Sequence, residues 1–409
     1  MNSITGNIPK DLMVQNFNFG SSLTSCKGTI RTRKLVVCDL TIPGGTPGSV
    51  LVNTGSGRAA WSSAPLTTAT INTGVTPTGL AITSDGAFAY VANNNNYGIT
   101  TGNYVSLLNL TTNMPEMNIF SGTFNQPYTV TLSTDETKAY ITNSAGSTLS
   151  VIDTATNQVT GTIGGSPFVP FFDGPSGLAI NGTTGYVNNY GSTPGAGSGN
   201  GTTISVVNLI TETLITTITV DLAPAAVALS IDGSLLYVVN YVTGATGSGT
   251  MQIIDTTTNT LLPVTITGFS GPFGIVMHPN GNFAYVSNFG SNNFDPYGST
   301  VSVVNLNSNT IVATIDVGIQ PSGIAVTPDG KYVYVSNYNT LYMVGSPTFS
   351  GLTAGEGTVN IIDTSTNELL PITIVVGQSP SNITISPSGD LAYVSNFTSG
   401  TVSVIRTVT

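Results

Sequence analysis

The segment Gly318–Asn337 reads GIQPSGIAVTPDGKYVYVSN. It contains a proline, a short apolar run, an Asp-Gly pair and a second apolar run that ends in asparagine. Val, Ile and Tyr fit the pleated, half-buried surface of a sheet, so both runs are typical of strands. An Asp-Gly pair between two such runs predicts a tight turn. We therefore expect two adjacent strands here, the first starting near Pro321 and the second ending at Asn337.

The same pattern occurs seven times along the chain, with repeat prolines 48 to 59 residues apart. A regular period in this range, with strand patterning throughout, predicts a propeller or a solenoid. The repeat prolines are Pro77, Pro127, Pro175, Pro224, Pro272, Pro321 and Pro380. The repeat asparagines, for which we expect a structural role at the strand end, are Asn93, Asn143, Asn189, Asn240, Asn288, Asn337 and Asn396.

The two ends of the repeat region are out of phase with each other. Thr68–Gly74 matches the fourth strand of other repeats, such as Ile311–Gly318, whereas the C-terminal Val402–Thr409 matches a third strand. Pairing these ends closes a ring and leaves no open sheet edge. Residues 67–409 number 343, or 49 for each of seven blades. The fold class predicted is all-β: a seven-bladed β-propeller of four-stranded blades at 67–409, with a small N-terminal β-rich head at 1–66.

The sixth repeat illustrates the strands expected in one blade. They are Gly323–Thr327, Tyr332–Ser336, Val359–Asp363 and Leu369–Val376. The first strand of each repeat is almost entirely apolar or small, so we expect it near the central channel with both faces covered by neighbouring blades.

The head contains a strand pattern at Thr29–Leu40 and the sequence GSVLVNTGSGRAAWSS at Gly48–Ser63. The latter predicts a hairpin and resembles an element of fibre and adhesin-type proteins of viruses and bacteria. An ordinary hairpin with a packed Trp61 is the alternative. Cys26 and Cys38 also lie in the head, and two cysteines do not define a pairing or a redox state.

Charge is distributed unevenly, with +4 in residues 1–66 and −14 in the rest. The overall net charge of −10 argues against nucleic-acid binding. No run approaches the ~18 apolar residues of a membrane span, and Met1–Gly20 lacks the apolar core of a secretory signal. We expect an extracellular surface or virion location without a standard signal peptide, or a cytoplasmic one if the chain is not part of a particle.

Short motifs carry a family resemblance. Ala139–Asn143 (AYITN), Ala284–Asn288 (AYVSN), Val333–Asn337 (VYVSN) and Ala392–Asn396 (AYVSN), together with SVIDTATN at Ser150–Asn157, resemble the Tyr-Val-Thr-Asn β-propeller repeats of archaeal surface-layer and bacterial secreted proteins. The resemblance covers residues 67–409 and implies a propeller without fixing a function, because propellers support unrelated activities.

The expected turns fall on two ends of the propeller. Asp-Gly turns and Thr/Asn turns are short and lie at one end, whereas all long loops follow the repeat asparagines or precede the repeat prolines at the other, the loop end. Variable loops on a rigid scaffold are the usual place for binding. Five residues directly after repeat asparagines are aromatic, and we weigh a recognition surface against side chains that seal the blade tops. The binding residues predicted at the loop end are Phe168, Phe171, Phe172, Tyr190, Tyr241, Phe289, Tyr297, Tyr338, Tyr342 and Phe349.

Catalytic motifs are missing from the sequence. The single histidine, His278, occupies a turn position that holds Thr or Ser in other repeats, so no multi-histidine metal centre can form. No phosphate-binding glycine loop precedes a helix, and no segment predicts a helix. We therefore predict no catalytic residues and no cofactor. A calcium site near Asp295 or Glu356 is left open, since loop carboxylates and carbonyls are suitable ligands.

Three functions are compatible with these features. The leading hypothesis is a non-enzymatic surface or virion structural protein, whose residues 1–66 mediate self-association or contact with a surface or capsid partner, and whose loop end binds a protein or glycan. The alternative is a propeller enzyme of the sugar-lactone hydrolase kind, with a pocket of acidic and polar groups at the channel mouth and a metal. A soluble carbohydrate-binding module is the third.

Overall fold

A computed structural model describes residues 67–94, 103–165, 171–191, 200–241, 249–290, 298–339 and 356–408, together with four short strands of the head. The chain divides into two compact units, Met1–Leu66 with Arg406–Thr409, and Thr67–Ile405. In the first unit, β1 (Met13–Val14) pairs with β2 (Gly28–Thr29), and β3 (Ser49–Asn53) forms an antiparallel hairpin with β4 (Ala59–Ser63). The hairpin expected within Gly48–Ser63 is therefore present. The strand expected at Thr29–Leu40 lies outside the described residues after Thr29.

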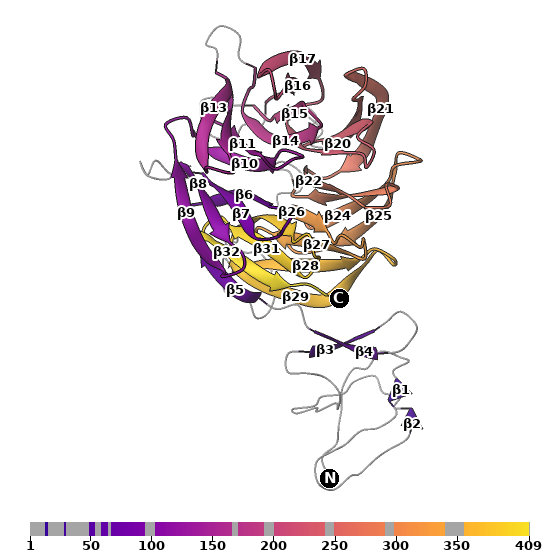
Figure 1. Ribbon diagram of the computed structural model, residues 1–409. Coiled ribbons are helices and arrows are strands. Elements are labelled where there is room, and N and C mark those ends of the chain that lie inside the picture. The colour runs from indigo at the N-terminus through magenta and orange to yellow at the C-terminus, as the bar shows by residue number, and fades with distance from the viewer. Residues whose placement is uncertain are drawn as a thin grey trace, which may run out of the picture. The chain divides into compact units, whose positions relative to one another are not determined.

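The second unit is a propeller of seven four-stranded antiparallel sheets arranged around a central channel (Figure 1). Blade one is β6 (Pro77–Ile82), β7 (Phe88–Asn93), β8 (Tyr104–Asn109) and β9 (Met114–Phe120); blade two is β10 (Pro127–Leu132), β11 (Lys138–Asn143), β12 (Thr148–Asp153) and β13 (Gln158–Gly164); blade three is β14 (Pro175–Asn181), β15 (Thr184–Asn189), β16 (Thr203–Asn208) and β17 (Thr213–Thr219).

Blade four is β18 (Pro224–Leu229), β19 (Leu235–Asn240), β20 (Gly249–Asp255) and β21 (Thr260–Phe269); blade five is β22 (Pro272–Met277), β23 (Phe283–Asn288), β24 (Thr300–Asn305) and β25 (Thr310–Asp316); blade six is β26 (Pro321–Val326), β27 (Tyr332–Asn337), β28 (Glu356–Asp363) and β29 (Glu368–Gln378). The seventh is β30 (Pro380–Ile385), β31 (Leu391–Asn396), β32 (Thr401–Arg406) and β5 (Thr67–Asn72). The fold class predicted from the sequence is confirmed, and the described part contains no helix that could cross a membrane.

Blade seven is built from both ends of the propeller sequence, as predicted. β5 runs antiparallel to β32, with Ile71 opposite Val402 and Ala69 opposite Val404. Ile71, Val402 and Val404 are buried in one apolar cluster. The first strand of the region thus supplies the outer strand of the last sheet, and no ladder of unpaired backbone groups remains on β32.

The four strands of a blade differ in how deeply their side chains are buried. The second and third strands are almost entirely buried, because neighbouring blades cover both of their faces. The fourth strand alternates, with one face turned to solvent. The first strand is only half-buried in most blades. The expectation that strand one is covered on both faces is therefore wrong, because its inner residues border the open channel.

The second strand of every blade carries a buried tyrosine. Three of these tyrosines donate their hydroxyl to an asparagine Oδ1 in the following blade: Tyr90 to Asn157 (2.6 Å), Tyr186 to Asn259 (2.9 Å) and Tyr285 to Asn367 (3.0 Å). The acceptor asparagines sit in the turn between strands three and four with positive φ, a conformation that asparagine tolerates. Burial raises the pKa of Tyr285 to about 12, so its hydroxyl keeps the proton that it donates.

In four blades a carboxylate holds the turn between strands one and two. In blade four, Asp232 accepts hydrogen bonds from the Ser230 hydroxyl (2.6 Å) and from the backbone N–H and hydroxyl of Ser234 (3.1 and 2.8 Å). These donors, with Ser230 the strongest, lower the pKa of Asp232 to about 2. Gly233 follows with φ of 72°, which only glycine adopts easily.

The lowered pKa of Asp232 makes stability depend on pH. A carboxyl group with a folded-state pKa below its unfolded value stabilises the fold above the unfolded value and loses that effect as the pH falls towards the folded one. We expect the thermal midpoint to stay level from pH 8 to 5 and to fall between about pH 4 and 2. Asp232→Asn should show a shallower fall, and Asn280 occupies the same turn position in blade five. Parallel pH curves for both proteins in thermal melts would contradict this prediction.

Because β5 completes the last blade, we expect it to contribute to the stability of the whole ring. Ile71→Ala should lower the free energy of unfolding by about 2–4 kcal/mol, because Ile71 is buried against β32. The control is Thr70→Ala, an exposed neighbour on the same strand, for which a change within about 0.5 kcal/mol is expected. Equal effects in urea titrations would mean that β5 is not part of the cooperative unit.

Candidate functional site

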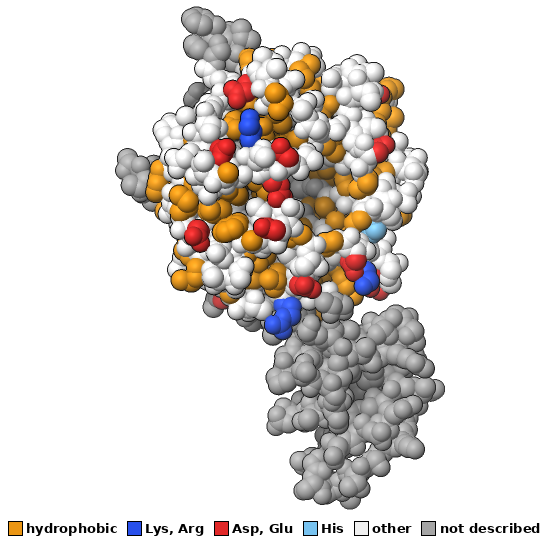
Figure 2. Space-filling model, viewed as in Figure 1, with side chains coloured by type: hydrophobic (Ala, Val, Ile, Leu, Met, Phe, Trp, Pro, Cys, Tyr) orange, Lys and Arg blue, Asp and Glu red, His pale blue; other side chains and the backbone are white. Residues whose placement is uncertain are grey.

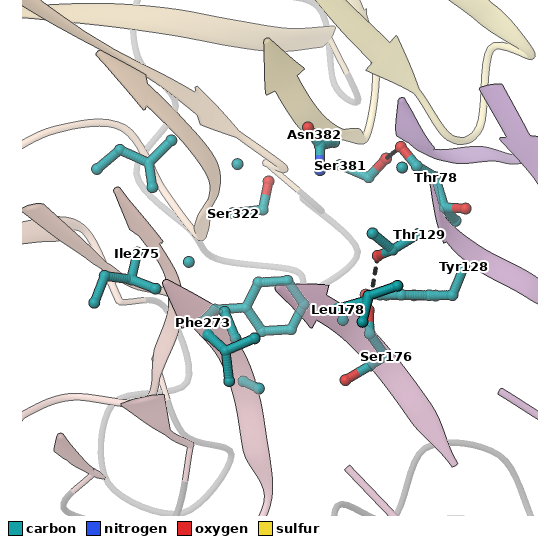
Figure 3. A pocket seen from close by; sticks show the side chains of 18 residues that line it. Thr78, Tyr128, Thr129, Ser176, Leu178, Phe273, Ile275, Ser322, Ser381 and Asn382 are labelled. Carbon is teal, nitrogen blue, oxygen red and sulfur yellow. Dashed lines mark hydrogen bonds between the residues drawn. The ribbon is translucent and has the colours of Figure 1, made fainter. Parts of the chain in front are cut away.

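A cavity of about 210 Å³ lies within the channel, bordered by the first strand of all seven blades (Figure 3). The first two residues after each repeat proline line it, which places the cavity towards the loop end. Those directly after the prolines are Thr78, Tyr128, Ser176, Ala225, Phe273, Ser322 and Ser381. The next ones are Gly79, Thr129, Gly177, Ala226, Gly274, Gly323 and Asn382.

Glycines let neighbouring first strands approach closely around the cavity. A Cβ atom on Gly79 would lie 2.7 Å from the Cα of Thr129, and one on Gly323 would lie 2.7 Å from the Cα of Asn382. Neither position has room for a side chain, because the obstacle is backbone. The small residues after the repeat prolines therefore set the width of the channel at this level.

Hydroxyl groups connect the first strands from blade to blade. Thr129 donates to the carbonyl of Ser176 (2.7 Å), Ser322 to that of Pro380 (2.7 Å) and Ser381 to that of Pro77 (3.1 Å). The bond between Thr129 and Ser176 is drawn in Figure 3. These side chains thus have a structural role as well as a surface on the cavity.

Blades four and five both lack such a hydroxyl in the two residues after the proline, which are Ala225-Ala226 and Phe273-Gly274. Tyr241, directly after the repeat asparagine of blade four, donates its hydroxyl to the carbonyl of Gly290 in blade five. A tyrosine from the loop end therefore bridges blades four and five, where strand one of blade four offers no hydroxyl.

Six aromatic side chains form a continuous series of ring contacts at the loop end, which we call the aromatic arc. Its centroid separations are 6.4 Å for Tyr190 to Tyr241, 6.4 Å for Tyr241 to Phe273, 5.3 Å for Phe273 to Phe289, 6.0 Å for Phe289 to Tyr338 and 6.4 Å for Tyr338 to Phe397. All six are half-buried. Tilted and edge-to-face rings at these distances attract each other.

Backbone hydrogen bonds explain where the arc lies. The residue after each repeat asparagine donates its N–H to the carbonyl of the residue before the repeat proline, as from Tyr338 to Gln320 and from Phe397 to Ser379 (both 2.9 Å). Gln320 and Ser379 have positive φ, 54° and 52°. The bond holds each aromatic beside the start of strand one, where Phe273 joins the arc to the cavity.

Tyr128 and Phe273 are the aromatic side chains among the described cavity lining and reach into it from opposite sides in Figure 3. Burial, with a smaller contribution from nearby Tyr338, raises the pKa of Tyr128 to about 12. Burial, together with Tyr241 and Tyr128, also raises the pKa of Tyr190. Both phenols are neutral at physiological pH and can donate hydrogen bonds to a ligand.

The predicted binding residues are distributed as follows. Tyr190, Tyr241, Phe289 and Tyr338 are brought together in the aromatic arc. Phe172 is 2% exposed and packs with Leu149 and Ile163, so we leave it out of the site, whereas Phe171 is half-buried against that cluster. Outside the described residues lie Phe168, Tyr297, Tyr342 and Phe349.

Sequence reasoning missed Tyr128 and Phe273. Each follows a repeat proline, at a position where the other blades have Ser, Thr or Ala. Their departure from the repeat was the available signal. The repeat pattern instead favoured the long loops as the place for binding, because they vary between blades.

The repeat asparagines do not line the site. All seven are buried, and each donates its Nδ2 to an oxygen of the third strand of the same blade. Asn143, for example, bonds the hydroxyls of Thr148 (3.0 Å) and Ser150 (2.9 Å). This geometry orders the loop-end edge of each sheet.

No charged side chain is found among the described residues that line the cavity. The loop end carries Asp173, Asp221, Asp316 and Glu356 among the described residues. Figure 2 shows the face with the histidine, where acidic side chains are scattered around a central hollow. There His278 holds its turn position, with Nε2 2.9 Å from the carbonyl of Gly330.

The acidic, metal-containing pocket expected for a propeller enzyme is not found at the described cavity, whose polar groups are hydroxyls and an amide. Within the described ranges, no three His, Cys, Asp or Glu side chains are grouped as metal ligands. The residues named for calcium stay a prediction, since Asp295 lies outside those ranges and Glu356 is isolated from any such group.

Comparisons with known proteins give one partial family match and a likeness of fold. A family model described as lactonase, 7-bladed beta-propeller, matches residues 221–344 and 250–408, which span blades four to seven. A search of curated proteins found no match. Among solved structures, a chain of Kuenenia stuttgartiensis hydrazine synthase has a TM-score of 0.66 at 19% identity, covering 82% of this chain and 96% of that chain. At that identity the likeness shows the fold alone.

The leading prediction from the sequence, a non-enzymatic surface or virion structural protein, is contradicted by the match to the lactonase model. The absence of familiar catalytic motifs suggested that prediction, but function depends on the site rather than on motif counts. The findings support a seven-bladed propeller similar to that family model, and they do not confirm the Tyr-Val-Thr-Asn family.

Tyr241→Phe tests the bridge between blades four and five. Removing the hydroxyl leaves the ring contacts in place but deprives the carbonyl of Gly290 of its donor. We expect the free energy of unfolding to fall by about 1 kcal/mol in denaturant titrations. A variant as stable as the original protein would show that this hydrogen bond contributes nothing to the junction.

Proposed function

We propose that the protein is a hydrolase that opens the ring of a lactone bound in the cavity at the loop end of the channel. The match of blades four to seven to the lactonase model carries this proposal. The site supports it, because a cavity of about 210 Å³ with polar groups inside and aromatic rings beside it suits a small cyclic ester.

The chemistry needs a donor for the carbonyl oxygen. Water adds to the carbonyl carbon, negative charge develops on that oxygen, and the bond to the ring oxygen then breaks to give a hydroxy acid. Neutral donors that face the developing charge stabilise this step. We assign this role to the Tyr128 phenol, since its raised pKa of about 12 keeps it protonated, with the Asn382 amide beside the same cavity.

The attacking water also requires a base. The described cavity lining contains no carboxylate, so we assign the base to the loop end. Asp173 is the first candidate, because its backbone carbonyl accepts from Gly191 (3.0 Å), next to Tyr190 of the aromatic arc. The Asp173 side chain is exposed at this end of the propeller.

Turnover of a panel of lactones, followed by acid release at constant pH, tests the proposal. The full chain should open at least one of them well above the background rate. Tyr128→Phe should lower kcat about a hundredfold, the usual cost of one oxyanion donor. The matched control is Tyr332→Phe, which removes a phenol at the Asp-Gly end and should leave the rate unchanged.

Two outcomes would contradict the proposal. No lactone opened above background would remove the assigned activity, and lactone binding without turnover would favour the carbohydrate-binding alternative. Full activity in Tyr128→Phe would remove the assigned donor while leaving the activity itself in place.

A further inference from the structure

Positive charge is confined to one end of the propeller. Residues 67–409 contain only three Lys or Arg residues and one histidine, and the long loops contain none of them. All four are found at the end that carries the Asp-Gly turns, in turns or at the strand ends beside them: Lys138, Lys331, Arg406 and His278. No cation of the propeller therefore reaches the cavity from the loop end.

This distribution disfavours an anionic ligand. A phosphate group in a protein site is normally paired with Arg or Lys. Here it would approach past four described carboxylates and enter a cavity without a charged lining. Burying an unpaired anion in such a place is costly. An uncharged ligand meets neither penalty.

The aromatic arc adds a second constraint, because it occupies only part of the circle. Blades three to seven have an aromatic residue after the repeat asparagine, whereas blades one and two have Asn94 and Ser144. The mouth of the cavity thus has a long apolar side and a short polar side.

We infer, on the basis of the proposed function, that the substrate is an uncharged lactone rather than a phosphorylated one. Its less polar ring face packs against the arc at Phe273, and its hydroxyl groups face the lining of blades one and two, where the hydroxyl oxygens of Thr78 and Thr129 can accept hydrogen bonds. Carbohydrate-like rings fit this division, because one face carries C–H groups that pack on aromatic side chains while the edge carries hydroxyls.

The test compares two lactones that differ in one phosphate: glucono-δ-lactone and its 6-phosphorylated form. The full chain should open the neutral lactone with kcat/KM at least about tenfold higher, a difference equivalent to about 1.4 kcal/mol. Higher salt should narrow this gap, because it screens the carboxylates at the loop end. Equal or better turnover of the phosphorylated lactone would overturn the inference and leave the proposed function standing.

A second test compares a charged and an uncharged side chain at one lining position, Ala225. Ala225→Arg puts a cation next to Phe273 in the neighbouring blade and should raise kcat/KM for the phosphorylated lactone about tenfold relative to the neutral one. Ala225→Gln, similar in length but uncharged, should not change the ratio. An unchanged ratio in folded Ala225→Arg, checked by circular dichroism, would also overturn the inference.

Failure of the proposed function would be recognised separately. If neither these two lactones nor the wider panel is opened above background, the hydrolase assignment falls, and the inference about its substrate falls with it.

Discussion

The closed ring depends on the pairing of β5 with β32. Six sheets are continuous in sequence, but the seventh is complete only when Thr67–Asn72 returns to the C-terminal strand. Without that pairing, the backbone groups of β32 and the buried Val402 and Val404 would meet solvent. Closure brings all first strands to one axis, and the cavity exists because seven of them converge there. The site is therefore a consequence of the whole ring and not of any single blade.

Around the cavity, structural and functional demands fall on the same positions. Hydroxyls such as those of Thr129 and Ser322 join neighbouring first strands and also form the polar wall of the channel. Tyr241 both bridges blades four and five and belongs to the aromatic arc. A residue that recurs in every repeat for structural reasons can therefore also belong to the site. Tyr128 and Phe273 depart from the small residues that other repeats have at this position, and they face each other across the cavity.

The motif search on the sequence led to a wrong functional conclusion for a physical reason. It looked for residues that act together near one another in sequence, such as histidine clusters or phosphate loops. A propeller instead assembles its site from residues about 49 positions apart, one from each repeat. Each contributes a hydroxyl, a ring or an amide that is unremarkable by itself. The lactonase family model, by contrast, matches a pattern that is spread over residues 221–408.

The sequence alone determined the number of blades, the order of the four strands in the sixth repeat with their ends to within three residues, and the pairing of the two ends. Strand periodicity and turn residues are local signals that repeat seven times. It also determined the charge of the loop end, since the cations are few and their turns are recognisable. Only the tertiary structure decided that the aromatics after the repeat asparagines touch each other, that Phe172 is a core residue, and that Tyr128 and Phe273 share one cavity. These are contacts between different blades, so they depend on how closely the first strands approach one another. Glycines such as Gly79 and Gly323 allow that close approach, because a side chain there would meet the backbone of the next blade.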